Sequence, residues 1–137
     1  APSRMGKQQS KIVVVENEKE VSLLSKLNAK VMGTDSDPFY GAKTVIVVFS
    51  NSESHTCVED GSLIMGNLMN AAHSLGVCSC WIHRAKEVFE FEEGKKLKQK
   101  WGIPESYVGI GYCIIGYTDD AIKQAADRKS DYVVYSE

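Results

Sequence analysis

The sequence lacks the features that mark several classes of protein. It has only 3 prolines and no low-complexity segment, and its 25% charged and 43% hydrophobic residues are typical of a globular chain. Neither sign of charge dominates, because 16 Lys and Arg face 18 Asp and Glu, which argues against a nucleic-acid partner. The longest apolar runs, residues 12–15 and 45–49, are too short to span a membrane.

Cysteine is also sparse, with 4 residues in the chain. Cys78 and Cys80 are separated by one residue and no secretory signal pattern is visible, so we expect reduced thiols in a cytoplasmic protein. His73 and His83 flank this pair, which raises the alternative of a zinc site. Strand alternation, however, places both thiols on the face of Ile82, a pattern typical of buried core cysteines.

The length of 137 residues predicts a single domain, residues 1–137. Short β-branched or apolar runs predict strands over residues 11–15, 43–49, 77–82, 107–117 and 131–135. Apolar residues at helical spacing predict helices over residues 18–30, 56–75 and 86–101. Thr56 and Glu59 match a capping box, Gly76 is a stop signal, and Gly94 is a candidate break in the last helix. This order predicts an α/β or α+β sandwich around one sheet.

Few residue patterns point to side-chain chemistry. Gly109, Gly111 and Gly116 do not have the spacing of a dinucleotide-binding turn and fall within a predicted strand, where glycine indicates close backbone approach. The lysines of residues 95–100 are offset by nearby glutamates, which is typical of a solvated helix face. No Ser-His-Asp or Cys-His set is recognisable, so no catalytic side chain is predicted.

Three segments carry a more specific signal. The chain opens Ala1-Pro2-Ser3, with Gln8 before the first strand. The central helix ends Ala-Ala-His-Ser-Leu-Gly at residues 71–76 and leads into Ser-Cys-Trp-Ile at residues 79–82. Arg128 follows Ala-Asp, with Lys129 after it, ahead of a Tyr-Val-Val-Tyr run. In this order the segments resemble the flavin-dependent nitroreductase family, whose motifs read A-P-S-x-x-x-x-Q, A-A-x-x-L-G, S-C-W-I and K-P-R.

The resemblance implies a fold and an assembly. It predicts an α+β, three-layer sandwich in which helices flank a mostly antiparallel sheet. It also predicts a homodimer whose subunits exchange a carboxyl-terminal strand and bind FMN at their interface. The family has amino-terminal helices with an R-S-x-R element for the phosphate, and we expect these helices to be missing from this chain.

The resemblance also implies the site residues. One subunit would contact the FMN ring or ribityl chain with residues of the opening loop: Pro2, Ser3, Arg4, Met5 and Gln8. The other would present the backbone of Ile82, His83 and Arg84 to the N5 edge of the ring. Arg128 would reach the phosphate, to which the fork of a guanidinium is suited.

The implied activity is that of an oxidoreductase. FMN would take hydride from NADH or NADPH and reduce a small-molecule acceptor such as a nitroaromatic or a quinone, with the cofactor supplying the chemistry. Two alternatives stay open. One is a non-catalytic flavin-binding or dimerising remnant, and the other is an FMN enzyme of the same fold with another acceptor, such as a dehalogenase.

Overall fold

A four-stranded sheet forms the centre of the computed structural model, which describes residues 1–121 and 123–136. The strand order is β1-β2-β4-β3, and all three neighbouring pairs are antiparallel. The elements along the chain are η1 (Arg4–Gly6), β1 (Ser10–Val15), α1 (Glu18–Met32), β2 (Thr44–Asn51), α2 (Cys57–Ser74), β3 (Cys78–Ile82), α3 (Ala85–Val88), α4 (Glu92–Lys100) and β4 (Tyr107–Gly116). The predicted α+β class is confirmed.

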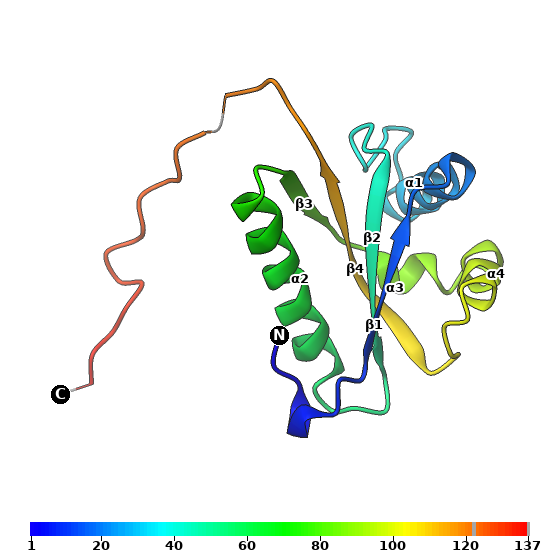
Figure 1. Ribbon diagram of the computed structural model, residues 1–137, viewed down its shortest axis with the longest axis horizontal. Helices are drawn as coiled ribbons and strands as arrows, with labels where there is room; N and C mark the ends of the chain where they lie inside the picture. The colour runs from blue at the N-terminus through cyan, green and yellow to red at the C-terminus, as the bar shows by residue number, and fades with distance from the viewer. Residues whose placement is uncertain (122, 137) are drawn as a thin grey trace.

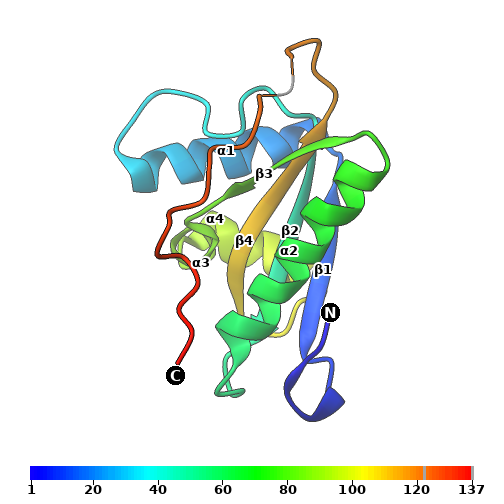
Figure 2. The same ribbon diagram turned by 90° about the vertical axis from the view of Figure 1, so that its left-hand side faces the viewer.

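Helices cover both faces of the sheet, as the two ribbon views show (Figures 1 and 2). α1, α3 and α4 lie on one face, where Leu24 and Leu27 of α1 are buried as their helical spacing predicts. α2 packs on the other face, against β2, β3 and β4. The predicted three-layer arrangement, with helices flanking an antiparallel sheet, is therefore confirmed.

The start of α2 differs from the prediction. Thr56 makes no side-chain bond to the helix backbone, and its φ of −108° and ψ of 26° are not the extended conformation of a capping residue. Its hydroxyl lies 3.4 Å from that of Ser54 instead. The predicted end is correct, because α2 stops at Ser74 and Gly76 adopts a left-handed φ of 72°.

The outward side of α2 is more polar than its apolar stripe suggests, since Glu59, Asn67 and Asn70 are exposed there beside Leu63. Its inward side buries Met65 against the sheet. Within the described part of the chain, no helix is both long enough and apolar enough to cross a membrane.

The predicted helix over residues 86–101 is two helices, α3 and α4. The break falls at residues 89–91, not at Gly94. Gly94 lies inside α4, where a Cβ would be 2.2 Å from the carbonyl oxygen of Val88, so only glycine permits this close crossing. Lys98 then fixes the connection to β4 by donating from Nζ to the carbonyl oxygens of Glu105 and Tyr107.

The predicted burial of Cys78 and Cys80 is wrong, since both are exposed free thiols. They lie on the edge strand β3, where only Ile82, at the end of the strand, is buried on the same face. Cys113 is buried on the α2 face, where desolvation, and secondarily Cys80, raises the pKa of its thiol. Among the described residues, no group of three acidic, His or Cys side chains could hold a metal ion.

The predicted strand over residues 131–135 is absent from the described carboxyl-terminal segment. This segment leaves β4 and runs away from the body of the molecule (Figure 1). A strand needs a neighbouring edge to satisfy its backbone, and no described strand pairs with these residues. Val134 and Tyr135 are 84% and 86% exposed, so the described part of the chain does not cover this apolar stretch.

Candidate functional site

The amino-terminal loop, residues 2–8, is fixed against the first turn of α2. The backbone N–H of Arg4 lies 3.3 Å from both carboxylate oxygens of the buried Asp60, and Ser3 Oγ accepts from the N–H of Gln8 at 2.9 Å. Met5 and Gln8 adopt left-handed φ values of 52° and 51°. These bonds hold a compact loop. Four of its predicted site residues are exposed, namely Pro2, Arg4, Met5 and Gln8. Sequence reasoning missed Asp60, which sits among ordinary first-turn acidic residues.

A second predicted group, residues 82–84, forms the turn between β3 and α3. Ile82 is buried, His83 is exposed, and Arg84 has a left-handed φ of 72°. Asn28 of α1 holds both polar residues: its Nδ2 donates to the carbonyl oxygen of His83, and its Oδ1 accepts from Nε of Arg84, each at 2.8 Å. Within the described residues, the backbone N–H groups of His83 and Arg84 have no acceptor. The turn therefore presents two backbone donors.

Tyr112 of β4 lies beneath this turn. It pairs with Ile82 in the sheet register and is fully buried. Its hydroxyl has no hydrogen-bond partner among the described residues. Burial, with a smaller contribution from Glu87, raises the pKa of Tyr112 well above its usual value, and Arg84 opposes the shift. The phenol therefore stays protonated and neutral beside the turn at physiological pH.

Gly109 of β4 lets the first residue of α3 approach the sheet. A Cβ at this position would lie 2.8 Å from the backbone carbon and oxygen of Ala85. Ala85 directly follows the turn, so this close approach fixes where the turn sits. The strand glycine thus has the role that its sequence position indicates, namely close backbone packing.

The predicted site residues form separate groups within one chain. The amino-terminal loop lies beside the start of α2, whereas the 82–84 turn lies between β3 and α3 (Figure 1). No hydrogen bond joins the two groups in the described structure. Arg128 is exposed and belongs to the carboxyl-terminal segment, which runs away from the body of the molecule (Figure 1).

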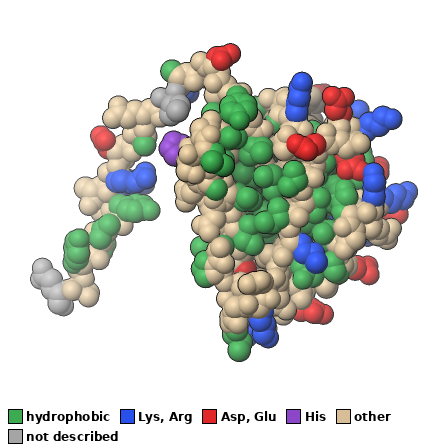
Figure 3. All heavy atoms as spheres, viewed as in Figure 1, with side chains coloured by type: hydrophobic (Ala, Val, Ile, Leu, Met, Phe, Trp, Pro, Cys, Tyr) green, Lys and Arg blue, Asp and Glu red, His purple; other side chains and the backbone are tan. Residues whose placement is uncertain are grey.

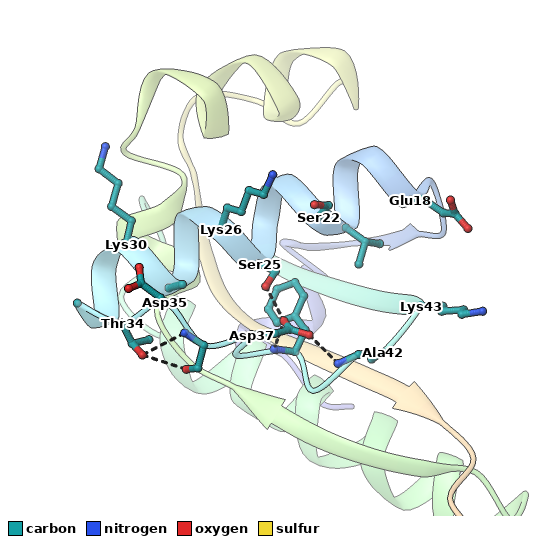
Figure 4. Close-up of a pocket in the computed structure, with 16 residues that line it drawn as sticks. Glu18, Ser22, Ser25, Lys26, Lys30, Thr34, Asp35, Asp37, Ala42 and Lys43 are labelled. Carbon is teal, nitrogen blue, oxygen red and sulfur yellow. Dashed lines mark hydrogen bonds between the residues drawn. The ribbon is translucent and has the colours of Figure 1, made fainter.

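A cavity of about 800 Å³ lies between α1 and the loop of residues 33–43 (Figure 4). Asp37 organises the loop by accepting from the Ser25 hydroxyl at 2.5 Å and the N–H groups of Phe39 and Gly41 at 2.9 and 2.6 Å. Partial burial raises the pKa of Asp37, but the three hydrogen bonds outweigh it and the net shift is downward. The cavity contains none of the predicted site residues. The loop instead supports Phe39, whose ring packs 5.2 Å from that of Tyr112.

The arrangement of sheet, turn and helix can be compared with known proteins. A sequence model described as the nitroreductase family matches residues 32–117, which include the turn and the helix that holds Asp60. The chain belongs to the nitroreductase family. No curated protein sequence matches it significantly.

Solved structures share the fold of this nitroreductase-family chain. A nitroreductase with bound FMN from Bacteroides fragilis NCTC 9343 has a TM-score of 0.87 at 22% identity, covering 100% of this chain and 81% of that one. One from Desulfitobacterium hafniense DCB-2, also with bound FMN, has a TM-score of 0.84 at 22% identity, with coverages of 100% and 80%. An iodotyrosine deiodinase bound to FMN and 3-iodo-L-tyrosine has a TM-score of 0.74 at 21% identity, with coverages of 100% and 81%.

Proposed function

We propose that this protein is an FMN-dependent oxidoreductase that uses NADH or NADPH to reduce nitroaromatics, quinones or related small acceptors. The observation that carries the proposal is the 82–84 turn, whose two backbone N–H donors have no acceptor among the described residues while its carbonyl is bonded inward to Asn28. Family membership and the fold shared with FMN-bound proteins support it. Bound FMN would supply the hydride and electron transfer.

The residues of the turn fit a planar group with a polar edge. The N–H groups of His83 and Arg84 are donors for such an edge, and the Arg84 guanidinium, which Asn28 binds, adds a positive charge to the turn that favours a reduced, electron-rich ring. On the amino-terminal loop, the bonds of Ser3 and Arg4 fix the backbone and leave the side chains of Pro2, Met5 and Gln8 exposed to contact the ring or its ribityl chain. No side chain is required as nucleophile or base.

A homodimer would bring the separate groups together. Ile12 and Val14 of β1 are 49% and 59% exposed on the α2 side of the sheet, and hydrophobic side chains gather over the sheet beside α2 (Figure 3). The carboxyl-terminal segment carries further exposed apolar residues and could add a strand to the sheet edge of a second copy. We propose a permanent interface larger than about 2,000 Å², with Arg128 reaching the FMN phosphate across it.

The location of the protein is also a proposal. Cys78 and Cys80 are exposed thiols that are not joined to each other or to another cysteine. Neighbouring free thiols on a surface persist in a reducing compartment, which supports the cytoplasm.

Flavin loading and reduction test the proposed function. The purified chain is incubated with FMN, desalted, and treated under nitrogen with NADH or NADPH. We expect a yellow protein that either donor bleaches and that a nitroaromatic or a quinone recolours. A protein that retains no FMN would support the remnant alternative. Recolouring by 3-iodo-L-tyrosine alone would support a dehalogenase, the alternative that the deiodinase fold favours.

A further inference from the structure

A polar side chain lies on the buried side of α1, at a position where the sequence pattern predicts an apolar residue. Asn28 is fully buried, next to Leu27, in a helix whose other inward positions are apolar. Burying an amide costs free energy unless its donor and acceptor are both bonded. The two hydrogen bonds of Asn28 therefore explain why an asparagine occupies this position.

Both bonds go to one turn, 55 and 56 residues further along the chain. Asn28 Nδ2 donates to the carbonyl oxygen of His83, and Asn28 Oδ1 accepts from Nε of Arg84. The amide thus fixes a backbone carbonyl and a side chain of consecutive residues. Leucine has a similar branched shape but could form neither bond.

The conformation of the turn is one that needs such support. Arg84 adopts a left-handed φ of 72°, a backbone conformation that is unfavourable for a residue with a side chain. With the His83 carbonyl and the Arg84 guanidinium both bonded inward, the N–H groups of these residues are left without a protein acceptor in the described structure. The Arg84 carbonyl also accepts from the N–H of Val88 at 3.1 Å, so the turn sets the start of α3.

We propose that Asn28 is a positioning residue for the flavin site: it holds the 82–84 turn so that the backbone donors of His83 and Arg84 face the cofactor, and it keeps the Arg84 cation at the turn. The proposal rests on the proposed function for its link to FMN. Its first part, the fixing of the turn, concerns the protein alone and can be tested without any cofactor.

Three variants of the full chain separate positioning from plain core packing. Asn28→Leu keeps the branched shape and removes both bonds, whereas Asn28→Asp keeps the acceptor for Arg84 and removes the donor to His83. Leu27→Ala is the matched control, since it removes buried apolar volume from the same helix and leaves both hydrogen bonds to the turn in place. The melting temperature of each variant provides the scale on which the other measurements are compared.

Amide hydrogen exchange at Val88 is measured first, without FMN. We expect Asn28→Leu to exchange about tenfold faster or more at Val88 relative to the strands, because the Arg84 acceptor is released. Asn28→Asp should show a smaller effect, and Leu27→Ala should change Val88 no more than the rest of the chain. Parent-like exchange at Val88 in both Asn28 variants would overturn the proposal.

FMN affinity and midpoint potential are measured next. We expect the dissociation constant to rise about 10- to 100-fold in Asn28→Leu and the potential to fall in it, as the Arg84 cation moves away, with both within about threefold of the parent in Leu27→Ala. Equal losses in Asn28→Leu and Leu27→Ala would reduce Asn28 to a core residue and overturn the link to the cofactor. If the parent binds no FMN, the proposed function fails, while the exchange result still decides whether Asn28 fixes the turn.

Discussion

The two faces of the sheet are covered to different degrees by the rest of the chain. On the closed face, under α1, α3 and α4, fifteen of the described residues form one buried cluster, in which the rings of Phe49 and Phe89 lie 4.7 Å apart. The buried cluster on the open face, under α2, consists of Val48, Met65, Ile110 and Cys113. Ile12 and Val14 remain exposed there. The closed face therefore buries most of the apolar core of this chain, whereas the open face leaves apolar side chains of β1 exposed.

The same difference divides the candidate site. The 82–84 turn is built on the closed face. Asn28 of α1 forms hydrogen bonds to it, Tyr112 of β4 pairs with Ile82, and both side chains are buried. The amino-terminal loop touches α2, on the open face, through Asp60. Both groups are thus held within a single chain, but the loop lies on the face where apolar side chains of β1 remain exposed.

The largest expected effect is on the closed face. Phe49→Ala empties a fully buried aromatic position in contact with Phe89, so we expect unfolding to cost about 3–5 kcal/mol less. Urea unfolding followed by circular dichroism measures the loss. Ile12→Ala on the open face is the comparison, and its half-exposed side chain should cost less than about 1 kcal/mol. Equal losses would contradict the distinction between the faces.

The open face should respond in assembly rather than in folding. Val14→Lys places a charge among exposed apolar residues, so we expect the dissociation constant of the dimer to rise about 100-fold, or roughly 2.7 kcal/mol. Sedimentation at micromolar concentration measures it. Lys11→Glu changes the charge on the same strand and should leave the dimer intact. A parent protein that is monomeric yet binds FMN normally would remove the two-subunit site.

Arg128 tests whether the carboxyl-terminal segment completes the site from the open side. If its guanidinium holds the phosphate, Arg128→Ala should weaken FMN binding by about 1.5–3 kcal/mol. Quenching of FMN fluorescence on binding measures the affinity. Lys123→Ala removes a nearby cation of the same segment and serves as the control. Unchanged retention of FMN in Arg128→Ala would place the phosphate elsewhere.

Much of the closed face could be predicted from the sequence. Periodicity located α1 and the strands because their patterns are set by local burial, and Gly109 had the role its position indicates. Gly76 did so too, at the end of α2 on the open face. The family resemblance located the 82–84 turn. It could not reveal Asn28 or Asp60, since a lone amide or acid within a helix carries no signal until the fold brings the distant turn or loop to it.

The errors lie where a property depends on neighbours distant in sequence. Cys78 and Cys80 alternate as core residues do, but β3 is an edge strand, and on the face that these thiols share with Ile82 only Ile82 is buried. Residues 131–135 have the composition of a strand, but a strand forms only beside another edge. Thr56 has the capping residue type without the capping conformation.

The residues that precede the two longest helices, α1 and α2, allow the two faces to be compared through smaller changes in the free energy of unfolding. Asn17, before α1 on the closed face, accepts from the N–H groups of Lys19 and Glu20. Thr56, before α2 on the open face, accepts from none in its helix. We therefore expect Asn17→Ala to lower the free energy of unfolding by about 1 kcal/mol and Thr56→Ala to change it by less than about 0.5 kcal/mol. If urea unfolding shows a larger loss of free energy for Thr56→Ala, Thr56 caps α2 as the sequence predicted.

The smallest expected effect concerns Asp37, whose loop seals the closed face around Phe39. Because its folded pKa is lowered, its contribution to stability is present above the unfolded value near 3.8 and is lost as pH falls through the folded pKa. The carboxylate is exposed, so screening limits this contribution to less than about 1 kcal/mol.

An asparagine at position 37 has one acceptor oxygen for the three donors that Asp37 binds, and its amide N–H would point at one of those donors. Asp37→Asn should therefore be less stable at pH 7 and lose part of the acid dependence, as thermal unfolding between pH 3 and 7 would measure. Ser25→Ala, which removes one of the three donors, should fall between the parent and Asp37→Asn, and acid dependence identical in all three proteins would show that Asp37 does not link this loop to pH.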